Sequence, residues 1–261
     1  MDLFHFNPQE FFSFLLTAMR ISIIVFMLPF FGASNVPNLV KAAACFILSL
    51  AVWPQLSFPG TVMPAHPFDL VLMLLGEVIL GLVLDIIVRF LFAAVQTGGQ
   101  LMGFQMGFSM MNVIDPMTGT SEAITAHYLY QVTVLLFLSF NGHLYLLQAL
   151  AQSFQLVPPG GLFINPILGE RLLEFSGLIF VVAVQIAAPV VVATFLVDLA
   201  LALVARAAPQ MNVLFVGFPL KIGVGFLFLT LVFSIMGRYV ADYIIDLGPM
   251  YHTIFRLSSA P

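Results

Sequence analysis

Charge is what this sequence has least of. Only 8% of its 261 residues are Asp, Glu, Lys or Arg, whereas a soluble domain carries about 25%. A soluble fold is therefore excluded, because too few charged side chains would be present to cover its surface. Basic residues are the scarcer kind, 8 against 12 acidic ones, and they form no cluster of the sort that binds phosphate backbones. We expect no nucleic-acid partner.

Cysteine is almost missing as well. The single cysteine, Cys45, lies in the apolar run AAACFILSL, so a disulfide within the chain is impossible and a cysteine metal cluster is not expected. We predict that Cys45 is a small buried apolar residue. The sequence contains no HExxH motif, and this removes the zinc site that such a motif would build. We expect neither a metal nor a cofactor.

Catalytic groups cannot be assembled from the sequence. Gly107-Phe108-Ser109 superficially resembles a nucleophile turn, but Met110 stands where a small residue is usual. His127 and His143 are the possible bases, and neither can be placed with both a nucleophile and an orienting group. We therefore expect a protein that is not an enzyme. An intramembrane protease is the third and weakest of the functions considered.

Apolar residues dominate what is present, at 61% of the chain. Residues 176–197 contain no charge and exceed the roughly 18 apolar residues that mark a membrane-spanning helix. A transmembrane barrel would show short alternating segments instead, so we predict an all-α integral membrane protein. The N-terminal MDLFHFNPQE has two acids and no cation. It is unlike a signal peptide, and we expect it to belong to the mature protein.

Turn residues divide the apolar sequence into about six long helices, which we expect to be arranged as hairpins. The predicted helices span residues 11–31, 39–56, 68–95, 124–151, 174–206 and 213–246. Charge bias barely orients them, because with the N-terminus outside the basic residues divide evenly between the two sides. We infer that some apolar helices pack on other protein chains and do not cross lipid in a simple order.

Two groups of charges lie inside apolar runs. Glu77, Asp85 and Arg89 share a broad helix face, and the last two have the i, i+4 spacing at which side chains meet. In the hairpin whose turn is Pro209-Gln210, Asp198 and Lys221 lie at matching depth, and we predict that they pair. Such groups could form an ion pathway or fixed salt bridges. We favour salt bridges, because each acid has a basic residue within reach.

The segment from Gln96 to Gly119 is rich in glycine and methionine. Methionines at 102, 106 and 110 and glycines at 99, 103 and 107 keep a step of four, so a helix here would carry a thioether stripe beside a bare backbone stripe. Two interpretations are open. Small residues allow close packing of membrane helices, and flexible thioethers can seal a pore of variable shape. Asp115-Pro116 would end the segment as a turn.

Four motifs together point to one family. They are GEVILGLVLDIIVR from Gly76, GGQLMGFQMGFSMMNVIDPMTG from Gly98, FLSFNGHLYLLQAL from Phe137 and RAAPQMNVLFVGFPLKIGVGF from Arg206. Over essentially the whole chain the sequence resembles the FliR/SctT family of type III secretion export gates, found in flagella and in virulence injectisomes. The PQMNVLFVGFPLKIG block is highly specific. The resemblance implies a fusion of two subunit types: a FliP-like part at 1–170, and a FliQ-like hairpin and tail at 171–261.

The resemblance also implies the partners. FliR-like proteins join FliP-like and FliQ-like subunits in the core of the flagellar export apparatus, at the basal body in the bacterial inner membrane. That core conducts unfolded flagellar subunits, with FlhB-like and FlhA-like export proteins as further partners and membrane lipid around it. The energy would come from an ATPase and a proton-driven partner. Candidate partner contacts on this chain are Glu77, Arg206, Pro209 and Gln210.

A plug loop inside the pore is a further family feature, and the matching segment here is Gly103 to Gly119. The residues that would form the plug are Gly103, Phe104, Met106, Gly107, Phe108, Met110, Met111, Asp115 and Pro116. Its mechanism would be steric and hydrophobic closure, since an apolar constriction can exclude water and ions. The alternative function is a stand-alone ion-coupled secondary transporter that binds cations at Glu77, Asp85 and Asp198. Such transporters are commonly built from inverted repeats, and no convincing repeat is visible.

Overall fold

The computed structural model describes residues 8–28, 36–53, 64, 66–108, 123–163 and 165–259, with the side chain of Leu214 left aside. All regular structure in these ranges is helical. The helices are α1 (Pro8–Met27), α3 (Asn38–Val52), α4 (Pro67–Met106), α6 (Ile124–Ser139), α7 (Gly142–Leu156), α8 (Pro166–Ala207) and α9 (Val213–Ser258). In the described part four helices are long and apolar enough to cross a membrane, and the bent pair α6–α7 adds a fifth if it is counted as one span.

The helices agree with the predicted set, with four differences, the first of which is that α8 begins at Pro166 and not at 174. Helix α4 continues to Met106, so the first half of the glycine- and methionine-rich segment is helical and does not separate two helices. The predicted helix 124–151 is two helices that meet at a bend of 66°. Asn141 sits at this break in the left-handed conformation with φ of 59°, which asparagine tolerates better than most residues. Helix α9 runs on to Ser258, well beyond the predicted end.

The chain forms two compact units and passes from one to the other four times. Unit 1 comprises Met1–Arg89, Asn141–Leu173 and Ile245–Pro261, and unit 2 comprises Phe90–Phe140 and Glu174–Ile244. One boundary lies at the break between α6 and α7, and the other three fall within α4, α8 and α9. These three helices have 40, 42 and 46 residues. At about 1.5 Å per residue they are roughly twice as long as the bilayer core is thick.

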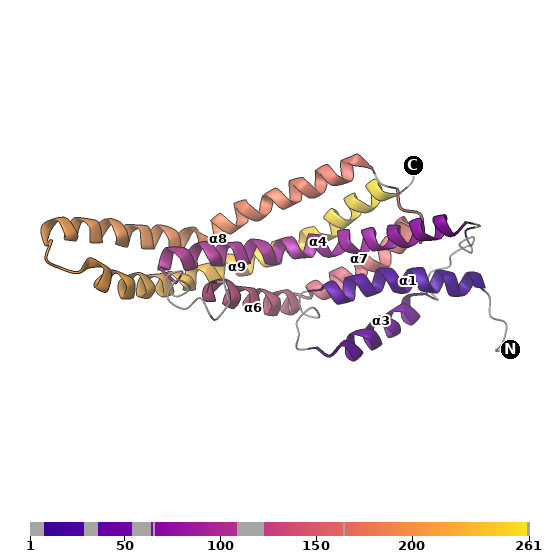
Figure 1. Ribbon diagram of the computed structural model, residues 1–261, viewed down its shortest axis with the longest axis horizontal. Coiled ribbons are helices and arrows are strands. Elements are labelled where there is room, and N and C mark those ends of the chain that lie inside the picture. Colours follow the sequence, from indigo (N-terminus) through magenta and orange to yellow (C-terminus); the bar gives the residue numbers. More distant parts are fainter. Residues whose placement is uncertain are drawn as a thin grey trace. The chain divides into compact units, whose positions relative to one another are not determined.

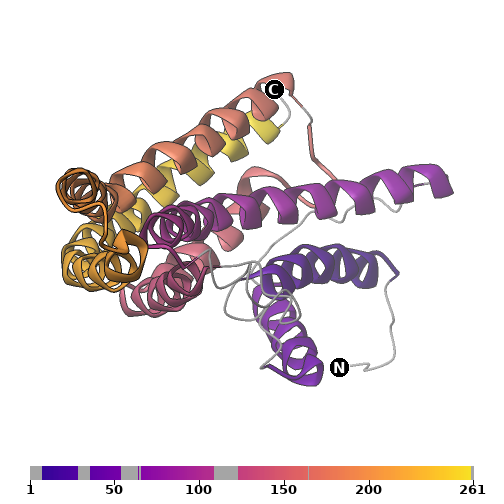
Figure 2. The same cartoon turned by 60° about the vertical axis from the view of Figure 1, so that its left-hand side comes forward.

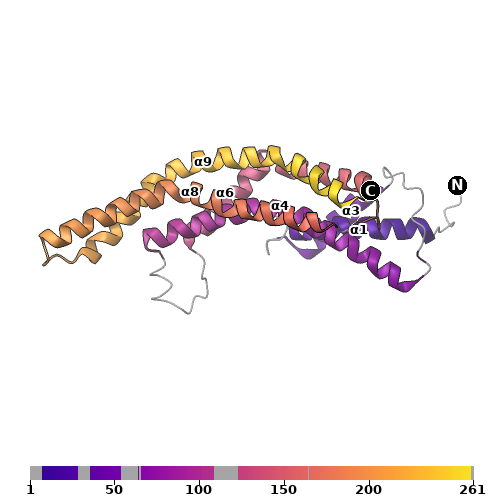
Figure 3. The ribbon, with the colours of Figure 1, turned by 90° about the horizontal axis from the view of Figure 1, so that it is seen from above.

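Unit 1 joins helices from both ends of the sequence. Helices α1 and α3 lie side by side (Figures 1 and 3), and the Trp53 indole donates a hydrogen bond to Ser13 Oγ at 2.9 Å. The C-terminal part of α9 is tied to α4, since the buried Tyr251 hydroxyl donates to the carbonyl of Leu84 at 2.7 Å. The C-terminal residues of the described chain are thus part of the core of the first unit.

Unit 2 brings together the second half of α4, α6, and most of α8 and α9. Figure 2 shows α6, the second half of α4 and the parts of α8 and α9 near their turn nearly end on. In Figure 1 α8 and α9 run side by side from the short turn that joins them. Glycine stands at several positions where two helices cross, and its lack of a side chain lets their backbones approach closely. A Cβ atom built on Gly98 would lie 3.0 Å from the carbonyl oxygen of Ala183, so α4 and α8 approach closely at this glycine.

Candidate functional site

The last turns of α4 use their glycines to pack against the start of α6. A Cβ atom on Gly99 would lie 2.5 Å from Ala126 Cα, and one on Gly103 would lie 2.6 Å from Thr125 Oγ1. The hydroxyl of Thr125 donates a hydrogen bond of 2.7 Å to the carbonyl of Gly99. The glycine stripe is therefore a helix-packing surface, in agreement with the first of the two interpretations of this segment.

The two methionines of the stripe that lie in α4 are also buried within the chain. Met102 and Met106 are both fully buried, and Met106 packs so closely on Gly225 of α9 that a Cβ there would lie 2.5 Å from the thioether methyl group. The side chain of Met106 thus packs inside this chain. The prediction that it seals the pore is corrected, and Met106 is a packing residue. Phe104, by contrast, is 60% exposed.

Helix α4 ends in a glycine cap. Gly107 has a φ of 91°, which is strained for any residue with a side chain. Its N–H donates to Phe104 O at 3.1 Å, and the N–H of Phe108 donates to Gly103 O at 3.0 Å. These two bonds form the Schellman arrangement, which satisfies the last carbonyl groups of the helix and turns the chain away from its axis. Met110, Met111, Asp115 and Pro116 lie outside the described residues.

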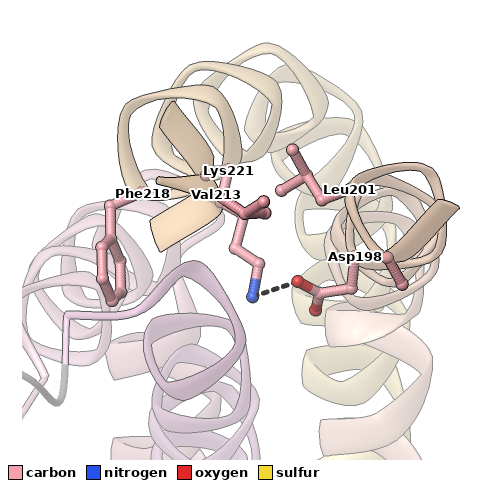
Figure 4. Close-up of a pocket in the computed structure, with 7 residues that line it drawn as sticks. Asp198, Leu201, Val213, Phe218 and Lys221 are labelled. Carbon is pink, nitrogen blue, oxygen red and sulfur yellow. Dashed lines mark ion pairs between the residues drawn. The ribbon is translucent and has the colours of Figure 1, made fainter. Parts of the chain in front are cut away.

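The Asp198–Lys221 pair predicted from the register of the hairpin is present. Lys221 Nζ lies 2.5 Å from Asp198 Oδ1, and Figure 4 shows the lysine reaching from α9 toward the carboxylate on α8. A third member, Gln105, was not predicted from the sequence, and its Nε2 lies 3.4 Å from Asp198 Oδ2. A cavity of about 190 Å³ lies beside the pair, and its lining is Asp198, Leu201, Ala202, Val213, Gly217, Phe218 and Lys221.

The second predicted contact, between Asp85 and Arg89, is also formed. Arg89 Nε donates to Asp85 Oδ2, and Nη2 of the same guanidinium donates to the carbonyl of Met27. Since Met27 is the last residue of α1, Arg89 satisfies a carbonyl at the end of that helix, where positive charge is favourable. The Asp85 side chain is buried while that of Arg89 is half exposed.

Glu77 has a buried partner that sequence reasoning missed. Arg20 of α1 donates from Nε to Glu77 Oε2 at 2.6 Å and from Nη2 to Oε1 at 3.0 Å. Both side chains are almost completely buried, so Glu77 is corrected from a candidate partner contact to an internal ion-pair residue. A lone cation in an apolar run is a signal that some partner exists, but nothing local identifies a partner 57 positions away.

The same guanidinium holds the chain that follows α7. Arg20 Nη1 donates to Ser153 Oγ and to the carbonyl of Val157, each at 3.1 Å. The N–H of Gly160 donates to Glu77 Oε1 at 2.9 Å, and the Phe154 ring centroid lies 4.3 Å from Arg20 Cζ. The ion pair therefore joins α1, α4 and α7 and fixes the turn that leads to α8.

The remaining partner-contact candidates lie at the tip of the hairpin. Arg206, Pro209 and Gln210 are exposed, and they stay available to another molecule. Throughout the described ranges, no group of three or more His, Cys, Asp or Glu side chains is placed to hold a metal ion.

Long apolar helices with charges paired inside the chain define a polytopic helical membrane protein. Residues 11–247 match the sequence model of the bacterial export proteins, family 1, and the chain belongs to this family. Two similar proteins are the flagellar biosynthetic protein FliR of Bacillus subtilis, 38% identical over 86% of this chain and 87% of that protein, and FliR of Escherichia coli, 31% identical over 79% and 78%. The Yop proteins translocation protein T of Yersinia pestis is 29% identical over 70% of this chain and 71% of its own.

Membership in this family places the chain in the bacterial inner membrane as a component of flagellar or type III protein export. The family consists of export-apparatus components and is not a known class of enzymes.

Proposed function

We propose that this chain is the FliR-type core subunit of a flagellar export gate, in which it completes a channel made with FliP-like and FliQ-like chains. The observation that carries the proposal is the family match over residues 11–247 together with 38% identity to a flagellar relative. The channel would conduct unfolded flagellar subunits, and FlhB-like and FlhA-like proteins would act with it. Residues 1–170 would supply the FliP-like part and 171–261 the FliQ-like hairpin and tail.

Helix length supports an assembly in which much of the chain is covered by protein. Helices α8 and α9 are longer than a bilayer core, as noted above, and they expose many large apolar side chains, including Phe180, Phe195 and Phe215 at 69%, 58% and 81%. An apolar surface that extends past the lipid would be unfavourable in water. Neighbouring subunits of similar helical character would remove it from water.

The segment 103–119 is proposed as the plug of this channel. The position at which this segment leaves α4 is fixed, because the glycine cap at Gly107 ends the helix and turns the chain. The Phe108 ring then packs edge to face against Phe226 of α9, with centroids 6.3 Å apart. Phe104, Phe108, Met110 and Met111 remain the proposed sealing side chains.

The secondary-transporter alternative finds no support in the charges. Asp85 pairs with Arg89, and Asp198 with Lys221, while Glu77 is held by Arg20. Acids that are already paired in this way would have to lose their partners before they could bind a cation.

Native mass spectrometry tests the proposal. The tagged chain is extracted gently after co-expression with the FliP-like and FliQ-like chains of the same bacterium. We expect one copy of this chain within a larger hetero-oligomer. A monomer or homodimer that ignores those chains would contradict the proposed assembly.

The plug is tested separately in cells that assemble the complete apparatus. Replacing Phe104, Phe108, Met110 and Met111 with serine should make the inner membrane leaky to ions, because an apolar constriction would become wettable. The measurement is the decay of membrane potential with a fluorescent reporter. The matched control replaces exposed Leu39 of α3 and Phe68 of α4 with serine. Lost secretion with an unchanged potential would show that the segment is a packing element.

A further inference from the structure

The residues at the end of α4 contact the C-terminal hairpin at several points, and two of these contacts carry the inference. We call residues 105–108 the root of the plug. We propose that Gln105, Gly107 and Phe218 are positioning residues that attach this root to the hairpin of α8 and α9, so that the hairpin sets where the plug begins. The inference rests on the proposed plug and adds the element that controls it.

The first contact is a shared carboxylate. Asp198 Oδ1 accepts from Lys221 Nζ at 2.5 Å, and its other oxygen, Oδ2, lies 3.4 Å from Gln105 Nε2. One side chain thereby connects α4 with both arms of the hairpin. Because Asp198 and Lys221 already neutralise each other, the neutral amide of Gln105 adds position and direction without adding charge.

The second contact is steric. A Cβ atom on Gly107 would lie 3.0 Å from Cδ1 and Cε1 of Phe218, so the backbone of the root rests directly against that ring. The positive φ of Gly107 makes the same position intolerant of a side chain for a separate reason. Met106, one residue before Gly107, packs against Gly225, which lies in α9 as Phe218 does. The root therefore follows the surface of α9 over two turns.

The hairpin has room to change at this level. The cavity of about 190 Å³ lies between its two arms and shares Phe218, Asp198 and Lys221 with the contacts described above. Figure 4 shows the ring of Phe218 and the side chain of Lys221 both below α9, with the ring to the left of the ion pair. A close-packed interface resists small displacements, whereas arms separated by a cavity can shift while losing fewer contacts. Movement of the arms would be passed to the root through the carboxylate and the ring.

The experiment uses cells with the complete export apparatus and measures ion leak through the inner membrane, with assembly checked by native mass spectrometry. Gln105→Glu puts a second carboxylate against Asp198 and should raise the leak about tenfold or more, the effect of losing a hydrogen bond to a charged group. Combining it with Asp198→Asn restores one carboxylate and one amide and should return the leak to the level of the unmodified protein. If Gln105 had only a structural role, neither Gln105→Glu nor its combination with Asp198→Asn would change the ion leak of a channel that has assembled.

Glycine variants test the steric contact. Gly107→Ala should leak, while Gly237→Ala, a helical position of α9 with no heavy atom within 4 Å of the added Cβ, is the matched control and should not. Phe218→Leu removes the ring without adding atoms and tests the same contact if Gly107→Ala prevents assembly. Leakage of Gly107→Ala or Phe218→Leu above the control supports the inference.

Deletion of residues 103–119 separates the two levels of the proposal. If the deletion leaks while Gln105→Glu, Gly107→Ala and Phe218→Leu all match Gly237→Ala, the positioning role is wrong and the plug stands. If the deletion does not leak, the plug itself is wrong and the inference falls with it. A double exchange at 105 and 198 that leaks as much as Gln105→Glu alone would overturn the role of the shared carboxylate.

Discussion

A single buried guanidinium links three helices of the first unit. Arg20 is bound by both oxygens of Glu77 and by two groups at the end of α7, and it stacks on the ring of Phe154. Burying two charges is costly, and the cost is offset only where geometry and additional hydrogen bonds are good. Removing one partner then leaves the other charge buried and unpaired.

Arg20→Ala should therefore lower the free energy of unfolding by about 3–5 kcal/mol. Reversible unfolding of the purified chain in mixed micelles measures the change. The exposed Arg256→Ala at the end of α9 is the control and should stay within about 0.5 kcal/mol of the unmodified protein. A loss below about 1 kcal/mol for Arg20→Ala would mean that Glu77 finds another partner or becomes protonated.

At the scale of elements, the packing of α4 against α6 depends on a glycine, because a side chain at that position would not fit between the two helices. The added Cβ in Gly99→Ala would meet the backbone of Ala126 at 2.5 Å, and backbone cannot move aside as a flexible side chain can. We expect a loss of about 1–3 kcal/mol in unfolding free energy. Gly177→Ala, with open space around it in α8, should instead be neutral or stabilising by up to about 1 kcal/mol. Equal effects of the two variants would argue against the close contact.

The break between α6 and α7 depends on the left-handed residue at its centre. Asn141→Gly keeps that conformation accessible and should leave stability nearly unchanged. Asn141→Ala should cost about 1–2 kcal/mol, because a Cβ disfavours positive φ. Thermal unfolding of the two variants beside the unmodified chain gives the comparison. If alanine is tolerated as well as glycine, residues 124–156 can form one straight helix.

At the scale of the whole molecule, the exposed tip of the hairpin is the surface offered to other chains. Arg206→Glu should reduce copurification with the FliP-like and FliQ-like chains several-fold, since reversing a charge at an interface places like charges together. Unfolding of the isolated chain should not change, because Arg206 is exposed. Arg256→Glu is the control for a charge reversal elsewhere. Unaltered copurification would remove the tip from the list of contact surfaces.

Local patterns predicted more of the fold than of the site. Helix existence followed from apolar runs and turn residues, and the Asp198–Lys221 pair followed from the register of a hairpin whose two arms are neighbours in sequence. Asp85 and Arg89 were predictable for the same reason, being one helical turn apart. The end of α4 was placed too early, because glycines that normally weaken a helix are stabilised here by their contact with α6.

The sequence by itself determined that this is an all-α membrane protein of the FliR/SctT family, because composition, apolar periodicity and family motifs are properties of the chain in order. Only the tertiary structure decided that Arg20 binds Glu77 across 57 positions, and that Gln105 joins Asp198 across 93. It also showed that Gly99 and Gly103 pack against the start of α6. Such contacts depend on how distant helices come together, and neither period nor spacing encodes that partner choice.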